Sequence, residues 1–278
     1  MGMQINTNLA ANNTYRNLAA TQNDMSKSLE KLSSGLRINR AADDAAGLAI
    51  SEGLKSQVGG LTVASRNAQD GISVIQTAEG SLNEVTSILQ RMRDLAVQGA
   101  NDSNSTESRA AIKTEATALG KEIDRIAQAT TFNGKQLLQT GSLTFQIGSG
   151  ATVNDQIVVA NVDVATAVGN LGLPAGATDF DVTTSTLAQT SLTKIDAAIT
   201  AISTGRASLG ADQNRLESVV KNLAVSKENL TAAGSRIRDT DMAEEMVKYT
   251  RSSILSQAGT AMLAQANQSN QGVLQLLR

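Results

Sequence analysis

The fold is decided by residues 192–230, which read LTKIDAAITAISTGRASLGADQNRLESVVKNLAVSKENL. Alternating steps of three and four residues pick out twelve positions in this stretch, and nine of them are apolar. The twelve are Leu192, Ile195, Ile199, Ile202, Arg206, Leu209, Gln213, Leu216, Val220, Leu223, Lys227 and Leu230. This spacing is typical of a helix in a coiled coil. A helix of about 45 residues would be roughly 70 Å long, so it needs partner helices along its length.

The N-terminal half of the chain supplies candidate partner helices. Residues 54–95 carry the same spacing, with a few polar interruptions. The apolar members are Leu54, Val58, Leu61, Ala68, Ile72, Ile75, Leu82 and Leu89, beside a row of Val85, Ile88, Met92 and Leu95. The turn-forming residues of NDSNST, 101–106, end this helix. A further helix is predicted from about residue 106 to 129.

The middle of the chain leans toward β-structure. Asn133-Gly134 predicts a tight turn. Strands are predicted at 142–148, 155–162 and 180–184, where Val, Thr and Phe replace Ala and Leu. Pro174, the one proline, lies in the same region, so the two flanking arms are free to form long helices.

Each end of the chain carries one amphipathic helix. The N-terminal stripe is Leu18, Met25, Leu29, Leu32 and Leu36, and the C-terminal stripe is Met242, Met246, Tyr249, Leu255, Ala258 and Met262. Because an isolated helix of this polarity is marginal in water, we expect the two helices to pair weakly and to order fully when other subunits cover them. The predicted fold is mainly α, with long antiparallel helices in a coiled-coil-like bundle, a small β-rich segment, and paired N- and C-terminal helices.

Composition argues against several classes of function. The chain has 24 Lys and Arg against 26 Asp and Glu, so its net charge of −2 offers no broad field for nucleic acid. Cys and His are absent, which removes the usual thiolate nucleophile, general base and zinc ligands. We therefore predict no enzyme activity, no catalytic residue, no metal site and no cofactor. Residues 1–15 show no signal-peptide pattern, and the uncharged stretch 252–277 is too polar to insert into a membrane.

Long strings of this sequence resemble bacterial flagellins. The N-terminal strings include INTNLAANNTYRNL (5–18), EKLSSGLRINRAADDAAGLAISEGLKSQVGGL (30–61) and LQRMRDLAVQGAN (89–101). The C-terminal strings are LGADQNRLESVVKNL (209–223), NLTAAGSRIRDTDMAEEM (229–246) and ILSQAGTAMLAQANQSNQGVLQLLR (254–278). The resemblance covers residues 3–140 and 187–278. The middle lacks the large outer domains that many flagellins insert there.

The resemblance implies a structural subunit that is exported and polymerises helically into the flagellar filament used for swimming. It implies an inner, channel-lining domain of residues 1–43 and 237–278, and an outer core domain of 44–236 with its β segment at about 141–186. Export would use the flagellar type III apparatus without a cleaved signal peptide and leave the protein extracellular. The implied partners are further copies of the chain, an export chaperone on the C-terminal helix, and cap and junction proteins.

Two groups of charged residues stand out, one as a candidate contact site and the other as a candidate cation site. In RINRAADDAAG, residues 37–47, the side chains of Arg37, Arg40, Asp43 and Asp44 form either ion pairs within or between subunits, or a solvated turn whose aspartates cap the next helix. The resemblance favours a contact role, and both roles can coexist. The cluster Asp239, Asp241, Glu244 and Glu245 is interpreted as structural, because it lacks the glycine-centred loop of a calcium site and opens a helix.

A further candidate surface holds Arg91, Leu95 and Gln98, which share one helical face. From the residues alone, Leu95 is a core or interface residue and Arg91 a solvated charge. The resemblance implies that this face packs against neighbouring subunits and is recognised by a host Toll-like receptor. Glu115 on the next helix matches the same pattern.

The last residues of the chain, VLQLLR (273–278), place Leu274, Leu276 and Leu277 at a terminus. Apolar side chains at a fraying end indicate an assembly surface, and packing against 5–18 is the alternative. By resemblance, a host inflammasome receptor also reads these leucines. Two other functions stay open for the chain as a whole: a hook–filament junction protein and an intracellular coiled-coil adaptor.

Overall fold

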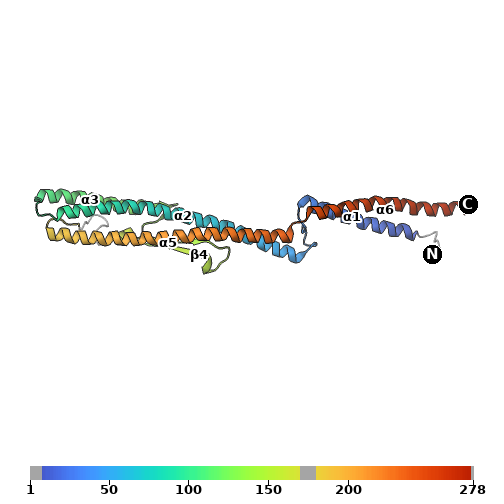
Figure 1. Ribbon diagram of the computed structural model, residues 1–278, viewed down its shortest axis with the longest axis horizontal. Helices are drawn as coiled ribbons and strands as arrows, with labels where there is room; N and C mark the ends of the chain where they lie inside the picture. The colour runs from blue at the N-terminus through green and yellow to red at the C-terminus, as the bar shows by residue number, and fades with distance from the viewer. Residues whose placement is uncertain (1–7, 170–179, 277–278) are drawn as a thin grey trace. The chain divides into compact units, whose positions relative to one another are not determined.

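Helices make up most of residues 8–169 and 180–276, which the computed structural model describes, apart from the side chains of 269–276 (Figure 1). The helices are α1 Leu9–Ser34, α2 Ala45–Gly99, α3 Thr106–Ala129, α4 Val164–Gly169, α5 Ser185–Arg238 and α6 Met242–Leu276. The strands are β1 Thr131–Phe132, β2 Lys135–Gln136, β3 Ser142–Gln146 and β4 Gln156–Ala160, and a 3-10 turn spans Val153–Asp155. The predicted class, mainly α with a small β-rich segment, is confirmed.

Contacts divide the chain into two compact units. The terminal unit comprises Met1–Gln57 and Asn229–Arg278, and the central unit comprises Val58–Glu228. The border between them falls inside α2 and α5, not at a loop. The predicted domains, 1–43 with 237–278 and 44–236, refer to inner and outer positions of the subunit in a filament. They stay a prediction.

The core of the central unit follows the heptad pattern of α5 and α2. Every seventh residue of α5 is buried, namely Ala188, Ile195, Ile202, Leu209, Leu216 and Leu223. The matching row of α2 is Ala68, Ile75, Leu82, Leu89 and Ala96. Cross-helix ion pairs show that the two helices are antiparallel, since Arg93 pairs with Asp196 at 2.7 Å and Arg206 with Glu79 at 3.6 Å. The predicted antiparallel bundle of long helices is therefore present in this unit.

A second buried row on each long helix consists largely of small residues, and the sequence pattern indicated only its large members, Val85 and Met92. On α2 this row is Ala64, Gly71, Ala78, Val85, Met92 and Gly99, and on α5 it begins Ser191 and Ala198. Small side chains are needed here because other segments approach closely. A Cβ on Gly71 would lie 3.1 Å from Leu216 and 3.3 Å from Phe145, and one on Gly99 would lie 2.7 Å from Val182.

Two antiparallel hairpins form the β-rich part. Strands β1 and β2 pair through Phe132 and Lys135, and the two residues between them have positive φ, 47° at Asn133 and 76° at Gly134. This conformation suits Asn-Gly, so the predicted turn is confirmed. Strands β3 and β4 pair over five positions. The predicted strands at 142–148 and 155–162 are thus present, each slightly shorter than expected.

The predicted strand at 180–184 is wrong. Phe180 and Val182 are buried, which explains the alternating pattern, but the segment pairs with no strand in the described ranges 8–169 and 180–276. Backbone N–H and C=O groups of this segment form hydrogen bonds with side chains instead. The N–H of Asp181 donates to Ser191 Oγ, and Ser191 Oγ donates to the Asp181 carbonyl, both at 3.0 Å. The Val182 carbonyl accepts from the buried Arg109 guanidinium at 3.1 Å.

The terminal unit pairs α1 with α6, which lie side by side in Figure 1. The pair is antiparallel. Asn8 Nδ2, at the start of α1, donates to the Ala266 carbonyl near the end of α6 at 3.0 Å, and Leu36 bridges to Asp239 at the opposite end. The expected pairing of the N- and C-terminal helices is therefore present.

Candidate assembly surfaces

The face of α6 that packs on α1 is made mostly of small and polar residues. Its least exposed positions are Glu245, Tyr249, Ser252, Ser253, Ser256, Gly259, Leu263 and Ala266. At Gly259 the two helices are so close that a Cβ would lie 3.2 Å from the Leu18 side chain. Leu18 and Ser28 are the buried positions of α1. This interface is narrow and holds few large apolar groups.

Most large apolar side chains of α6 point away from α1. Val247 is 58 % exposed and Ile254 is 60 % exposed, and Met242, Met246, Leu255 and Met262 are also exposed. A largely apolar strip runs along the helix, lined by Ala243, Met246, Val247, Thr250, Arg251, Ile254 and Leu255. Except for Tyr249, the predicted C-terminal stripe therefore does not form the contact with α1. Its apolar residues occupy other sides of the helix, and small residues make the contact.

Helix α1 repeats this arrangement on a smaller scale. Leu9, Tyr15 and Leu29 are more than half exposed, whereas Met25 and Leu32 are partly covered. A helix with apolar residues on several sides is normally buried on several sides. Large exposed apolar patches mark interaction sites. The uneven spread of apolar residues around α6 is the sequence signal from which Val247 and Ile254 were predictable, and a single stripe along the helix does not include them.

The charged residues of 37–47 form an ordered turn between α1 and α2. Asp44 Oδ1 accepts from the Gly47 N–H at 2.9 Å and so caps α2. Arg37 donates from its backbone N–H to the Arg238 carbonyl at 2.6 Å, and from Nη2 to the Ile237 carbonyl at 2.8 Å. These bonds tie the turn to the end of α5, within the terminal unit.

Asp43 and Arg40 complete the same turn. Asp43 Oδ2 accepts from the Arg40 and Asn39 N–H groups at 2.9 and 3.1 Å, and these bonds hold the pKa of the Asp43 carboxyl below its usual value. Arg40 Nε pairs with Glu30 at 2.9 Å, which raises the pKa of Arg40. Helix capping and ion pairing within the subunit therefore coexist here. Contact between subunits stays a prediction.

The predicted receptor-facing residues lie on α2 and α3 of the central unit. Arg91 and Glu115 are exposed and form a salt bridge at 2.7 Å between the two helices. Gln98 is exposed as well. Leu95 is only 2 % exposed and belongs to the core beneath them. The structure thus brings three polar side chains onto one surface and places Leu95 under it.

The remaining predicted contacts fall at the C-terminus. Leu277 lies outside the described residues, as do the side chains of Leu274 and Leu276, although α6 extends through Leu276. The assembly role assigned to these leucines stays a prediction.

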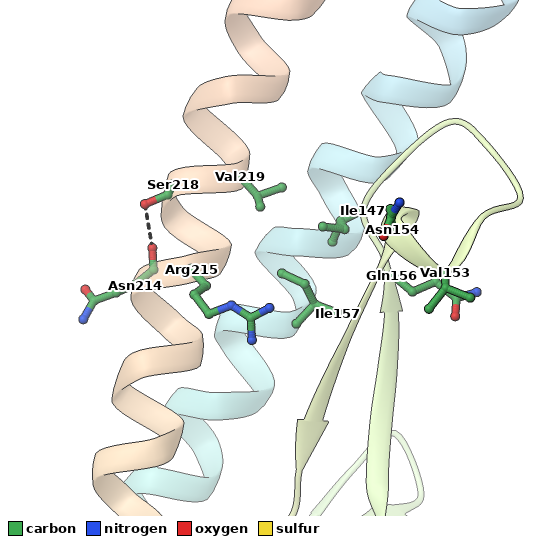
Figure 2. Close-up of a pocket in the computed structure, with 9 residues that line it drawn as sticks. All are labelled: Ile147, Val153, Asn154, Gln156, Ile157, Asn214, Arg215, Ser218 and Val219. Atoms are coloured by element: carbon green, nitrogen blue, oxygen red, sulfur yellow. Dashed lines mark hydrogen bonds between the residues drawn. The ribbon is translucent and has the colours of Figure 1, made fainter.

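A groove opens between the β3–β4 hairpin and α5, with a volume of about 580 Å³ (Figure 2). Its lining is Ile147, Val153, Asn154, Gln156, Ile157, Asn214, Arg215, Ser218 and Val219. Arg215 is its one charged side chain and pairs with Asp212 at 2.9 Å. The hairpin rests on α2, where Asn67 Nδ2 donates to the Gln146 carbonyl at 3.0 Å. This lining offers neither a nucleophile with a base nor a set of metal ligands.

The acidic cluster at the start of α6 is used structurally. Asp241 Oδ1 accepts from the N–H groups of Ala243 and Glu244 at 2.9 and 3.2 Å, which caps the helix. Lys248 pairs with Glu244 at 2.9 Å and lies 3.6 Å from Glu245. Among the described residues, no group of three or more acidic side chains has the arrangement of a metal site, and no helix is long and apolar enough to cross a bilayer.

Comparisons with known proteins agree with this architecture. The family model for the bacterial flagellin N-terminal helical region matches residues 5–142, and the model for the C-terminal helical region matches 192–277. A flagellin of Halalkalibacterium halodurans is 53 % identical over 276 residues, covering 99 % of this chain and 100 % of the relative.

Two solved structures are also similar. The crystal structure of Bacillus cereus flagellin has a TM-score of 0.50 and 30 % identity, over 61 % of this chain and 94 % of that one. A putative flagellar hook-associated protein of Vibrio parahaemolyticus has a TM-score of 0.57 over 71 % of this chain and 100 % of that one. Its identity is 15 %, so this second likeness concerns the fold alone.

Proposed function

The chain belongs to the bacterial flagellin family and is a structural subunit of the flagellar filament, and on that premise we propose that α1 and α6 carry the main contacts between subunits. Neither alternative function, a hook–filament junction protein or an intracellular coiled-coil adaptor, gains support. The likeness to a hook-associated protein concerns only the fold, whereas identity to a flagellin extends over the whole chain.

The observation that carries the proposal is the exposed apolar surface of α6. Val247, Ile254 and Leu255 are all more than half exposed, on sides of the helix that α1 does not cover. Each such side chain gains roughly 1.5–3 kcal/mol when fully buried. Within one subunit nothing covers them among the described residues. Packing against α1 and α6 of other copies buries them.

The contact is of a kind that builds an open polymer. The apolar strip of α6 and the exposed residues of α1, such as Tyr15 and Leu29, are different surfaces. A contact between two different surfaces is heterologous and produces a helical filament when the rotation does not close. The predicted inner domain, 1–43 with 237–278, and the leucines at 274, 276 and 277 belong to this proposed interface.

Further partners follow from the same surface. A free subunit with exposed apolar helices needs protection before it assembles, which supports binding of α6 by an export chaperone. Cap and junction proteins would meet the same helices at the ends of the filament. We also propose that the subunit works outside the cell, because a relative that matches nearly the whole chain is a flagellin.

A charge placed in the strip tests the proposal. Ile254→Asp puts a carboxylate on the outer side of α6, where burial without a partner would oppose assembly. We expect Ile254→Asp monomer to keep its helix content by circular dichroism but to form no filaments by electron microscopy or sedimentation. The matched variant Ile254→Leu keeps the side chain apolar and should assemble. Normal filaments from Ile254→Asp would disprove a central role for this strip.

We propose a second role for the surface of Arg91, Gln98 and Glu115, which is recognition by a host Toll-like receptor. The exposed Arg91–Glu115 pair and the neighbouring amide offer a polar patch, and buried Leu95 supports it from below. Arg91→Ala should lower the response of a receptor reporter assay by about tenfold. Arg93→Ala is the control, because Arg93 pairs with Asp196 at the same 2.7 Å distance. No response to wild-type monomer at high dose would exclude this role.

A further inference from the structure

We propose that Met242, Met246 and Met262 on α6 form an oxidation site at which hydrogen peroxide prevents the free subunit from joining a filament. The proposal rests on the assembly role of α6 given above. It adds a covalent modification that controls that surface.

Methionine is the main target for peroxide in this chain. The sequence has no Cys and no Trp, and seven Met. Thiols are absent, so the reversible disulfide and sulfenic acid chemistry of cysteine cannot occur, and the thioether is the group left to react. Any control by peroxide must therefore act through methionine.

The structure concentrates the reactive methionines on one helix. Of the five described methionines, Met92 is fully buried in the central core and Met25 is partly buried. Met242, Met246 and Met262 are 48, 51 and 62 % exposed. Among the five described methionines, those of α6 are therefore the most accessible to peroxide in solution, and buried Met92 serves as the unreactive internal reference.

The chemical step is a two-electron oxygen transfer. A lone pair of the thioether sulfur attacks one peroxide oxygen, the O–O bond breaks, and the sulfur is oxidised to a sulfoxide. The peroxide is reduced, because its second oxygen leaves as hydroxide and takes the proton of the transferred oxygen to become water. The product side chain is polar and accepts hydrogen bonds.

The position of Met246 makes this change decisive for packing. Met246 borders the apolar strip together with Val247, Ile254 and Leu255, where no charged or hydrogen-bonding side chain other than Thr250 and Arg251 lines the surface. A sulfoxide oxygen buried against an apolar partner would lose its bond to water and find few donors. Once a subunit is packed, the same burial keeps peroxide away from the sulfur. Oxidation is therefore selective for subunits that are not yet assembled.

Peptide mapping by mass spectrometry tests the reactivity. In monomer treated with hydrogen peroxide, the three α6 methionines should be oxidised at least about tenfold faster than Met92. In intact filaments, their oxidation should slow by at least about tenfold, toward the rate of Met92. Equal rates in monomer and filament, or similar rates for α6 and Met92 in the monomer, would overturn the proposal.

Assembly of the same samples tests the consequence. Oxidised wild-type monomer should require at least about tenfold more protein to polymerise. Methionine sulfoxide reductases of both stereospecificities should restore assembly, and their thiol reductant has no cysteine to act on in this chain. Normal assembly of monomer shown to be oxidised at all three residues would overturn the proposal.

A triple variant separates this proposal from the assembly role. Met242→Leu, Met246→Leu and Met262→Leu together conserve apolar volume, so the variant should assemble before and after peroxide treatment. Met92→Leu is the matched control and should remain peroxide-sensitive. Peroxide sensitivity that persists in the triple variant overturns the oxidation site but leaves α6 as the interface. If Ile254→Asp assembles, the proposed interface on α6 is itself overturned. If the triple variant fails to assemble, the peptide map of the wild-type protein still tests the reactivity of the three methionines.

Discussion

The central and terminal units use helices of similar composition in opposite ways. In the central unit, α2, α3 and α5 bury a continuous set of Leu, Ile, Val and Met side chains around one core. In the terminal unit, the α1–α6 contact buries little more than Leu18 and Ser28 on α1, and leaves Val247 and Ile254 in solvent. The central unit is completed by its own residues. The terminal unit leaves apolar surface exposed, and under the proposed function other copies of the chain cover it.

The largest expected effect comes from opening the central core. Leu82→Ala removes a fully buried side chain of α2 and should lower the free energy of unfolding by about 2–5 kcal/mol. Leu29→Ala, at an exposed position of α1, should change it by less than about 0.5 kcal/mol. Urea unfolding of the monomer measures both. A large loss from Leu29→Ala would mean that the terminal unit has a core of its own.

Hydrogen exchange compares the two units directly. Amides of α1 and α6 in free monomer should exchange at least about 100-fold faster than those of α2 and α5 in the central unit, because little apolar area opposes local opening. In filaments, the terminal amides should become protected. Slow exchange of α1 and α6 in the monomer would contradict the proposal that these helices are stabilised mainly by contacts with other subunits.

Helix caps give a smaller effect in each unit. Asp44→Ala removes the cap of α2 in the terminal unit, and Ser105→Ala removes the cap of α3, where Ser105 accepts from the Ser108 N–H at 3.2 Å. Each change should cost about 1 kcal/mol. The loss from Ser105→Ala should appear in global unfolding, whereas that from Asp44→Ala should appear only in local exchange near the turn. The comparison fails if Asp44→Ala lowers global stability as much as Ser105→Ala does.

The smallest effect is a pH dependence. Hydrogen bonds from Arg40 and Asn39 lower the pKa of Asp43, and the Thr152 hydroxyl and N–H lower the pKa of Asp155. A carboxyl with a lowered folded-state pKa stabilises the fold above its unfolded pKa, and this contribution disappears as pH falls through the folded value. Both turns should therefore loosen below about pH 4. Asp43→Asn should remove the acid transition near Asp43 only, as followed by NMR, and an unchanged transition would exclude this carboxyl as its source.

The accuracy of prediction from sequence differed between large and small residues. The row of Ile195, Ile202, Leu209 and Leu216 was visible because each large apolar side chain signals its own burial. The small members of the second row, such as Gly71 and Ala78, were not visible. A glycine carries no hydrophobic signal, and its burial depends on which segment approaches it.

The same reason explains the wrongly predicted strand at 180–184, and it explains why spacing alone left Leu95 open as either a core or an interface residue. The alternation of Phe180 and Val182 indicates burial, but a strand also requires a neighbouring strand, and there the backbone bonds to Ser191 and Arg109 instead. Leu95 shares a helical face with Arg91, yet it is buried because α2 packs with that edge toward the core. Spacing along one helix does not reveal how its neighbours rotate it.

The amino-acid sequence by itself determined the class of this protein. Its heptad spacing requires long paired helices, its composition lacks Cys and His, and its terminal strings carry the family resemblance. Only the tertiary structure decided which side of α6 is free. Contact between two helices selects small residues such as Gly259 for close approach, and the larger Met246 and Ile254 are then turned outward. Which residues make that contact depends on the shapes of both helix surfaces, so the sequence of one helix alone does not determine it.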